Sequence, residues 1–416
     1  MARREQNRTG LRLLFVAMLV VGGCYLSAGM IASMIITGPS LVNALGKPIG
    51  RDFVTFYAAS AMALDGEAAA TYDVAAIHAE EKMAIGAPLE PLAWHYPPPG
   101  LLIVLPLALL PYLLALTLWL AIQFGSLAAL LRVIAPQLAL LGLVAPATAQ
   151  SVISGQNGLL SASLIGGGLL MLERRPGLAG AILGLLVYKP QIGVLILPAL
   201  IAGGQWRAIA AMAASAAGFS ALGLIVFGPD PWLAFFRNMS FVRELVEHGR
   251  LPLSRFPTVF VGLRLAGAPL ALAYGCQAAS ALAALVVVVA AWRRQGPFGL
   301  KAAVLLLATP LATPYAFDYD LTILLPGLAW LAALGLARGF RWGEIVMLPA
   351  LWLMPVATWL LAEWTGVQVG PVILALGLVA VWARLVRPGT GYESALPTAG
   401  EDHRLPVAGT GRSSVR

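Results

Sequence analysis

Charged residues are scarce in this sequence. They make up 11% of its 416 positions, whereas soluble globular chains carry roughly a quarter. Hydrophobic residues reach 59% and gather in long runs such as 11–36, 209–227 and 270–292. These runs are close to the ~20 residues that cross a bilayer as a helix. The composition therefore excludes a water-soluble fold and indicates a polytopic membrane protein.

Cysteine and the common catalytic signatures are also nearly absent. Only Cys24 and Cys276 occur, each inside an apolar run, which excludes a disulfide framework or a thiolate metal site. There is no Walker A loop, GxSxG elbow, HExxH helix or dinucleotide fingerprint. We therefore expect neither a metal nor a cofactor. The net charge of +8 indicates membrane topology and not nucleic-acid binding, because basic residues flank the apolar runs.

The apolar runs predict an all-α fold, because they are long and lack the alternation of barrel strands. The first run is too long for a cleaved signal peptide, so we expect a retained span. Arg3, Arg4, Arg8 and Arg12 precede it, which places the N-terminus in the cytoplasm. With about twelve membrane segments, the later basic clusters and the C-terminus also become cytoplasmic. The expected location is the inner (plasma) membrane.

We expect residues 1–387 to form one transmembrane domain with two long extracytoplasmic loops, 38–97 and 228–257. The first loop is predicted to hold short amphipathic helices over Asp52–Asp65 and Tyr72–Ile85, with apolar faces on the membrane surface. The remaining residues, 388–416, are polar and rich in Gly, Pro, Ser and Thr. This composition predicts a disordered cytoplasmic tail.

The apolar run 177–203 is predicted to be broken at Tyr188-Lys189-Pro190-Gln191. Both its basic flanks belong in the cytoplasm, which requires two short segments. Proline ends the first of them, and a lysine at membrane depth is tolerated mainly where it faces protein or a wet cavity. Lys189 is therefore a candidate ligand for phosphate.

The most suggestive carboxylate is Asp52, in Arg51-Asp52-Phe53 directly after the first span. A carboxylate at the membrane surface can take a proton from a hydroxyl group that attacks a membrane-embedded electrophile. Aspartate is also a favoured helix N-cap, and an apolar helix is predicted to follow. The residues alone leave both roles open.

Four arginines, at 237, 243, 250 and 255, lie in the second outward loop, although the chain otherwise keeps its basic residues inside. Guanidinium groups clamp phosphate oxygens in a fork geometry, so the cluster is typical of a phosphate site. Glu244 and Glu247 could instead pair with the arginines along a solvated helix. Both interpretations stay open.

Several motifs, taken in order, make the chain resemble glycosyltransferase family 87 over roughly residues 10–385. They are Arg51-Asp52-Phe53 with Phe56-Tyr57, Gly66, Tyr72-Asp73, Tyr96-Pro97-Pro98, 106–111, Gly155-Gln156-Asn157-Gly158, Tyr188-Lys189-Pro190-Gln191, and Thr313-Pro314-Tyr315 through Asp320. The resemblance implies a GT-C fold and transfer of a sugar, typically mannose, from a polyprenyl-phosphate donor to an extracytoplasmic lipid or glycan acceptor. It also implies that Asp52 is the catalytic base.

The first hypothesis is an inverting glycosyltransferase, in which Asp52 deprotonates the acceptor hydroxyl and that oxygen attacks the anomeric carbon of the sugar. The expected partners are the donor, the acceptor and membrane lipids. A lipid or solute transporter or flippase is the alternative, because broken helices with a buried lysine also suit alternating access. The absence of duplicated halves favours the enzyme. The predicted substrate-binding residues are Arg51, Tyr57, Tyr96, Gln156, Asn157, Lys189, Arg237, Arg243, Tyr315, Asp318, Tyr319 and Asp320.

Overall fold

The computed structural model of the chain describes residues 2–35 and 39–387, and the predicted tail at 388–416 lies outside them. The structure is 77% helix, and its described part contains no β-strand beyond an isolated bridge between Val42 and Pro48. The predicted all-α fold is therefore confirmed.

Helices of very different lengths follow one another along the chain. The longest α-helices are α1 (Ala2–Met34), α5 (Tyr112–Ile134), α11 (Trp206–Phe227), α12 (Asp230–Glu247), α14 (Leu270–Arg293) and α17 (Trp342–Thr365). The shorter α-helices are α2 (Phe53–Leu64), α3 (Val74–Ile85), α4 (Pro99–Val104), α6 (Ala139–Leu143), α7 (Pro146–Ile153), α8 (Gly158–Met171), α9 (Pro176–Gly184), α10 (Ile196–Ala202), α13 (Val259–Leu265), α15 (Phe298–Ala312), α16 (Leu324–Arg338) and α18 (Gly370–Val386). The 3₁₀ helices are η1 (Ala70–Tyr72), η2 (Leu107–Leu109), η3 (Pro136–Leu138), η4 (Leu185–Tyr188), η5 (Pro190–Ile192), η6 (Leu253–Arg255) and η7 (Asp318–Ile323).

Fewer helices are long enough to cross a membrane than the twelve predicted segments. Among the described residues six qualify by length and composition, or seven if the bent pair Pro136–Leu143 and Pro146–Ile153 is one span. The other apolar runs form shorter helices. The 14 residues of α8, for example, extend about 21 Å, less than the ~30 Å of a hydrocarbon core. A count of twelve spans is therefore not confirmed.

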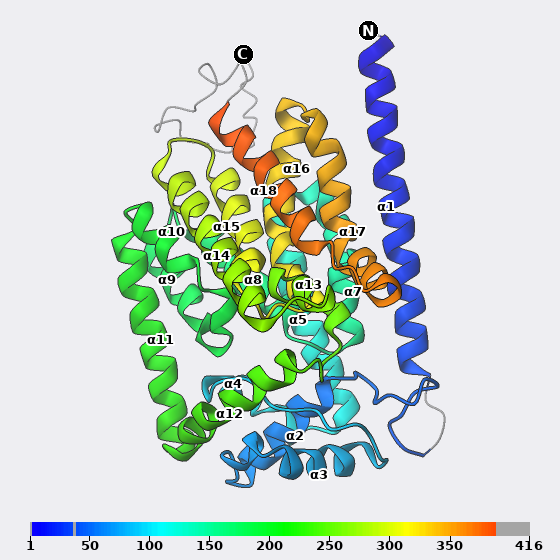
Figure 1. Ribbon diagram of the computed structural model, residues 1–416, viewed down its shortest axis with the longest axis vertical. Helices are drawn as coiled ribbons and strands as arrows, with labels where there is room; N and C mark the ends of the chain where they lie inside the picture. Colours follow the sequence, from blue (N-terminus) through cyan, green and yellow to red (C-terminus); the bar gives the residue numbers. More distant parts are fainter. Residues whose placement is uncertain (1, 36–38, 388–416) are drawn as a thin grey trace, which may run out of the picture.

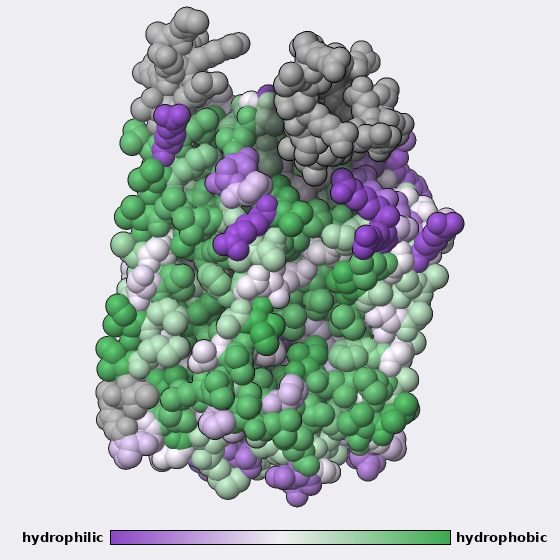
Figure 2. Space-filling view, turned by 180° about the vertical axis from the view of Figure 1, so that it is seen from behind, coloured by the Kyte–Doolittle hydropathy of each residue, from purple (hydrophilic) through white to green (hydrophobic). Residues whose placement is uncertain are grey.

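Helices α5, α11, α14 and α17 run roughly along one direction, whereas α12 lies across one end of the bundle (Figure 1). Helix α1 begins and α18 finishes at one end, whereas α2, α3 and α12 lie at the other. Figure 2 shows one face that is mostly hydrophobic between hydrophilic groups gathered toward its two ends. This pattern is what a helical bundle in a bilayer requires, because the lipid core offers no partners for polar groups.

The segment 39–97 forms the two predicted helices, α2 and α3, but α2 does not present an apolar face to lipid. Nine of its 12 residues are buried. Phe53 packs edge-on against Tyr112 at 5.2 Å, and Phe56 does so against Trp119 at 5.6 Å. The predicted membrane-surface position is therefore wrong for α2, because aromatic packing against α5 encloses it in protein.

The predicted break in the run 177–203 is confirmed. Helix α9 tightens into η4, which finishes at Tyr188, and η5 begins at Pro190. The proline has no N–H group to continue the helical ladder, so the backbone turns at Lys189. The break thereby places a lysine in the interior of the bundle, where it is 2% exposed.

An apolar groove lies between α1, α16 and α17, and none of the residues of the polar cluster described below lines it. Phe15, Leu328 and Leu348 are among the side chains that line it. Trp352 also lines the groove, and α1 packs closely against this residue at Gly22, whose hypothetical Cβ would lie 2.8 Å from the Trp352 ring. The groove is therefore a feature of the lateral surface, separate from the polar cluster.

Candidate active site

Asp52 stands at the start of α2, but its side chain does not cap that helix. Its backbone is helical and its carboxylate accepts no capping hydrogen bond. Instead, Oδ2 accepts a hydrogen bond of 2.9 Å from the Gln156 amide, and the Asp52 N–H donates to the Ser154 carbonyl. Asp73 provides a contrast, since its carboxylate caps α3 by accepting from Ala75 and Ala76. Asp52 therefore does not act as the N-cap of α2, which was one of the two roles considered for it.

Two glycines shape the turn that carries the amide side chains. Gly155 adopts a φ of +63°, and a Cβ there would lie 2.6 Å from the Gly50 carbonyl. Gly158 begins α8, and a Cβ there would lie 2.4 Å from the Tyr319 carbonyl. Any larger residue would separate these segments. The glycines therefore let the turn contact the Asp52 segment on one side and η7 on the other.

Gly158→Ala is expected to lower the free energy of unfolding by about 1–3 kcal/mol, because the added methyl group forces α8 away from η7. Thermal unfolding of the purified protein measures the change. Gly167→Ala is the control, since it lies in the same helix and its Cβ meets no atom within 4 Å. Equal changes in the two variants would contradict the argument.

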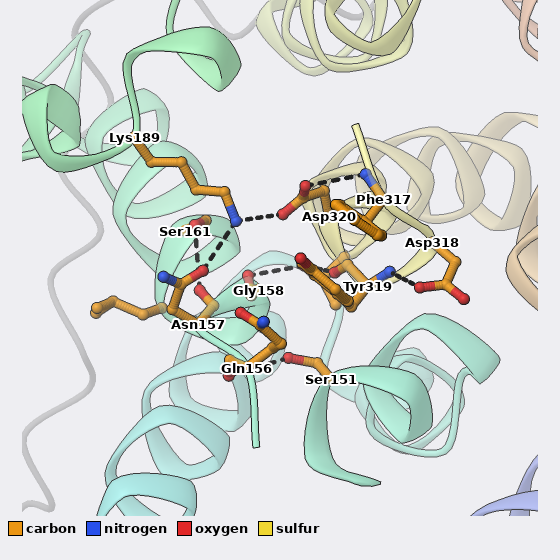
Figure 3. Close-up of polar contacts among 12 residues, drawn as sticks. Ser151, Gln156, Asn157, Gly158, Ser161, Lys189, Phe317, Asp318, Tyr319 and Asp320 are labelled. Atoms are coloured by element: carbon orange, nitrogen blue, oxygen red, sulfur yellow. Dashed lines mark hydrogen bonds and ion pairs between the residues drawn. The ribbon is translucent and has the colours of Figure 1, made fainter. Parts of the chain in front are cut away.

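Lys189 forms the centre of a buried polar group that Figure 3 shows. Its Nζ donates to Asn157 Oδ1 at 2.9 Å and to Asp320 Oδ1 at 2.5 Å. It also lies 5.7 Å from the ring centre of Tyr96 and 5.3 Å from that of Tyr319. Five predicted site residues therefore come together from four separate segments.

Arg255 forms the second buried ion pair. Its guanidinium donates to both carboxylate oxygens of Asp318, at 2.8 and 2.9 Å, and lies 5.8 Å from the Tyr319 ring. Arg237 and Arg243, which were predicted to bind substrate, are exposed on α12 and do not join this cluster. The sequence placed all these arginines in one loop, but only the folded chain distinguishes Arg255.

Tyr96 links the two ends of the site. Its hydroxyl group donates to Gln156 Oε1 at 3.3 Å, and its ring stacks on Tyr188 at 6.2 Å. Burial raises the pKa of Tyr96, and the nearby charge of Asp320 raises it further. The phenol therefore keeps its proton and remains a hydrogen-bond donor toward Gln156, which in turn holds Asp52.

Two predicted tyrosines are used elsewhere. The Tyr57 hydroxyl donates to the Leu110 carbonyl at 3.0 Å, and its ring packs on Tyr112. Tyr315 shares a side-chain hydrogen bond with Tyr274. Each hydroxyl thus has a structural partner, so the structure does not bring either residue into the cluster around Lys189.

Arg51 is held in an unusual conformation beside Asp52. It is the one non-glycine residue of the described chain with a positive φ, +42°. Its Nε is buried without a hydrogen-bond partner, and within the described residues its side chain forms no ion pair. Such strain and an unpaired donor are more common at functional sites than elsewhere.

Tyr25 of α1 lies near the site. It is within electrostatic range of Asp318, Arg255 and Arg51. Asp52 likewise lies within electrostatic range of Arg255 and Tyr319. Tyr25 was not predicted, because a tyrosine inside an apolar run carries no signal of its own. The Arg255–Asp318 ion pair, Arg51 and Asp52 therefore lie within electrostatic range of common neighbours.

A bundle of apolar helices that gathers a carboxylate, amides, aromatic rings and buried cations at one place defines a membrane enzyme for a polar substrate. The chain belongs to glycosyltransferase family 87, which matches residues 94–314, or 221 of 416. The resemblance found in the sequence is thereby confirmed, and the protein is a membrane glycosyltransferase that acts on a sugar donor and an acceptor. Comparisons with curated proteins and with solved structures give no match.

The family match covers one part of the site. Tyr96, Gln156, Asn157, Lys189 and Arg255 lie inside it. Arg51, Asp52 and the residues of η7 lie outside. The role of Asp52 therefore depends on its geometry and on the Arg51-Asp52-Phe53 motif. Among the described residues no three His, Cys, Asp or Glu side chains converge as metal ligands would.

Proposed function

We propose that the protein transfers a sugar, mannose in the first instance, from a polyprenyl-phosphate donor to an extracytoplasmic lipid or glycan acceptor. The observation that carries the proposal is the Asp52 carboxylate. It is partly exposed, does not cap α2, and is held by Gln156 near two ion pairs and an arginine without an ion-pair partner among the described residues. A carboxylate placed in this way can accept a proton in the transition state.

The proposed step is a single displacement. Asp52 takes the proton of the acceptor hydroxyl while that oxygen forms a bond to the anomeric carbon of the sugar. The bond between that carbon and the phosphate oxygen breaks, and its electron pair leaves with the lipid phosphate. Attack from the side opposite the phosphate inverts the anomeric centre. Tyr96, whose side chain is partly exposed, would contact the sugar.

The leaving phosphate needs positive charge near it. The cations of the site differ in whether a carboxylate already pairs with them. Lys189 and Arg255 are each neutralised by an aspartate. Arg51 has no such partner among the described residues and lies next to Asp52. We therefore assign the phosphate to Arg51, with the two ion pairs fixing the surrounding groups and their field.

Arg51→Ala is expected to raise the donor KM or lower kcat/KM roughly 10- to 100-fold, the effect of losing a hydrogen bond to a charged group. Initial rates at several donor concentrations measure it. Arg237→Ala is the control, because Arg237 is exposed on α12. Equal losses in the two variants would argue for a general effect of surface charge instead.

We further propose that both ends of residues 1–387 face the cytoplasm and that the site faces outward, with 38–97 and 228–257 on the outer side of an inner membrane. The start of α1 and the end of α18 lie at one end of the bundle, opposite α2, α3 and α12. The short helices would then combine into further membrane segments.

Reconstituted vesicles supplied with polyprenyl-phosphate mannose and a membrane extract as acceptor source test the function. Formation of a mannosylated product supports it, and polyprenyl-phosphate glucose tests the sugar. The broken helix at Lys189 keeps a flippase as the second candidate. Movement of labelled donor lipid across the vesicle bilayer, without any product, would favour the flippase.

A further inference from the structure

One buried carboxylate lacks the kind of partner that the others have. Four acidic side chains are fully buried in the described chain. Asp318, Asp320 and Glu344 each face an arginine or a lysine, whereas Glu81 is 0% exposed and has only His78 as a basic neighbour, at 3.4 Å. Burying a carboxylate without a strong cation is costly, so its presence calls for a role.

Neutral hydrogen-bond donors hold Glu81 in place. The Thr55 hydroxyl donates to Oε1 at 2.7 Å, and the Leu92 N–H donates to Oε2 at 3.2 Å. Helix α3, which carries Glu81, packs along α2, which carries Thr55. Oε1 therefore holds the first turn of α2, and Oε2 joins the same carboxylate to the segment at Leu92.

That turn of α2 begins at Asp52. The Thr55 N–H donates to the Asp52 carbonyl at 3.2 Å, so one turn of backbone joins the contact with Glu81 to the candidate base. The charge of Asp52 also acts on Glu81 directly. Both carboxylates lie near the positive end of the same helix dipole and compete for it.

We propose that Glu81 is a positioning residue for Asp52. Glu81 fixes the first turn of α2 through Thr55, and its negative charge favours proton uptake by Asp52. The inference rests on the proposed function of Asp52 as the base. It adds a dependence of the activity on pH, because the negative charge of Glu81 is present only when that side chain is ionised.

The groups around Glu81 place its ionisation near neutral pH. Burial raises the pKa of Glu81 to about 7, the hydrogen bonds from Thr55 and Leu92 lower it, and the charge of Asp52 raises it. The other titratable groups that face Glu81 are His78 on its own helix and Tyr112 on α5. As pH rises through 7, Glu81 therefore gains its negative charge beside the first turn of α2.

Glu81→Gln is the test, with Glu80→Gln as the matched control on the same helix. Glutamine keeps an acceptor for Thr55 but removes the charge. We expect the rise of kcat between about pH 6 and about pH 8 to disappear, so that kcat above neutral pH falls roughly tenfold while the donor KM and the activity at lower pH stay close to wild type. A loss of activity of the same size at every pH would show a merely structural role and overturn the proposal, as would an unchanged pH profile.

Infrared spectroscopy gives a readout that needs no activity. Wild type and Glu80→Gln should show a protonated-carboxyl band that disappears as pH rises through neutrality, and Glu81→Gln should lack it. Thr55→Val should shift the disappearance to higher pH, because it removes a donor to the ionised form. Absence of the band in wild type overturns the inference. Absence of sugar transfer by wild type contradicts the proposed function alone.

Discussion

Asp52→Asn is expected to slow sugar transfer by about 10²- to 10⁴-fold, the usual contribution of a general base. The asparagine side-chain oxygen can still accept the hydrogen bond from Gln156, so the geometry of the turn should persist. It cannot take up the proton of the acceptor hydroxyl. Transfer from labelled donor in vesicles, together with donor binding, separates the two effects, and binding should remain close to wild type.

The control for this variant is Asp73→Asn, which makes the same change at the start of the next helix. Asp73 caps α3, and asparagine is about as good a cap, so neither stability nor transfer should change much. If Asp52→Asn keeps full activity, or if Asp73→Asn loses as much, Asp52 is not the base.

Lys189→Met is expected to destabilise the protein by about 3–5 kcal/mol, because it leaves Asp320 as a buried charge without its partner. Transfer should also be lost, since Asn157, Tyr96 and Tyr319 all surround the ammonium group. Thermal unfolding in detergent and transfer in vesicles measure the two effects separately.

The double variant Lys189→Met with Asp320→Asn distinguishes stability from function. An asparagine at 320 removes the unpaired charge but can still accept from the Phe317 N–H. Much of the stability should return, and activity should not. Lys47→Met is the control, since its pair with Glu90 is exposed and should contribute little. Recovery of both properties would mean that the pair has only a structural role.

Local patterns predicted several elements well. The apolar composition identified a helical membrane protein, and the residues of α2 and α3 were placed almost to the residue. The break at Pro190 followed from the missing N–H of proline. Each of these depends on neighbours in the chain, which a single sequence displays directly. The resemblance to glycosyltransferase family 87 also followed from short, ordered motifs.

The number of spans and several site residues were less predictable. Apolar runs of similar composition formed both spanning and shorter helices, because packing against protein can replace lipid around a short helix. Arg237 and Arg243 were chosen as phosphate ligands from the same loop that contains Arg255. Nothing local separates an arginine on the exposed side of α12 from one directed at Asp318.

The sequence by itself determined the class of protein, its family and the candidate base. Hydrophobic length, proline position and motif order are properties of contiguous residues. Only the tertiary structure decided which polar groups form the site. Lys189 and Asp320 are 131 positions apart, and Gln156 and Asp52 are 104 apart. Such pairs arise because a low-dielectric interior leaves each buried charge or amide stable only where folding brings it a partner.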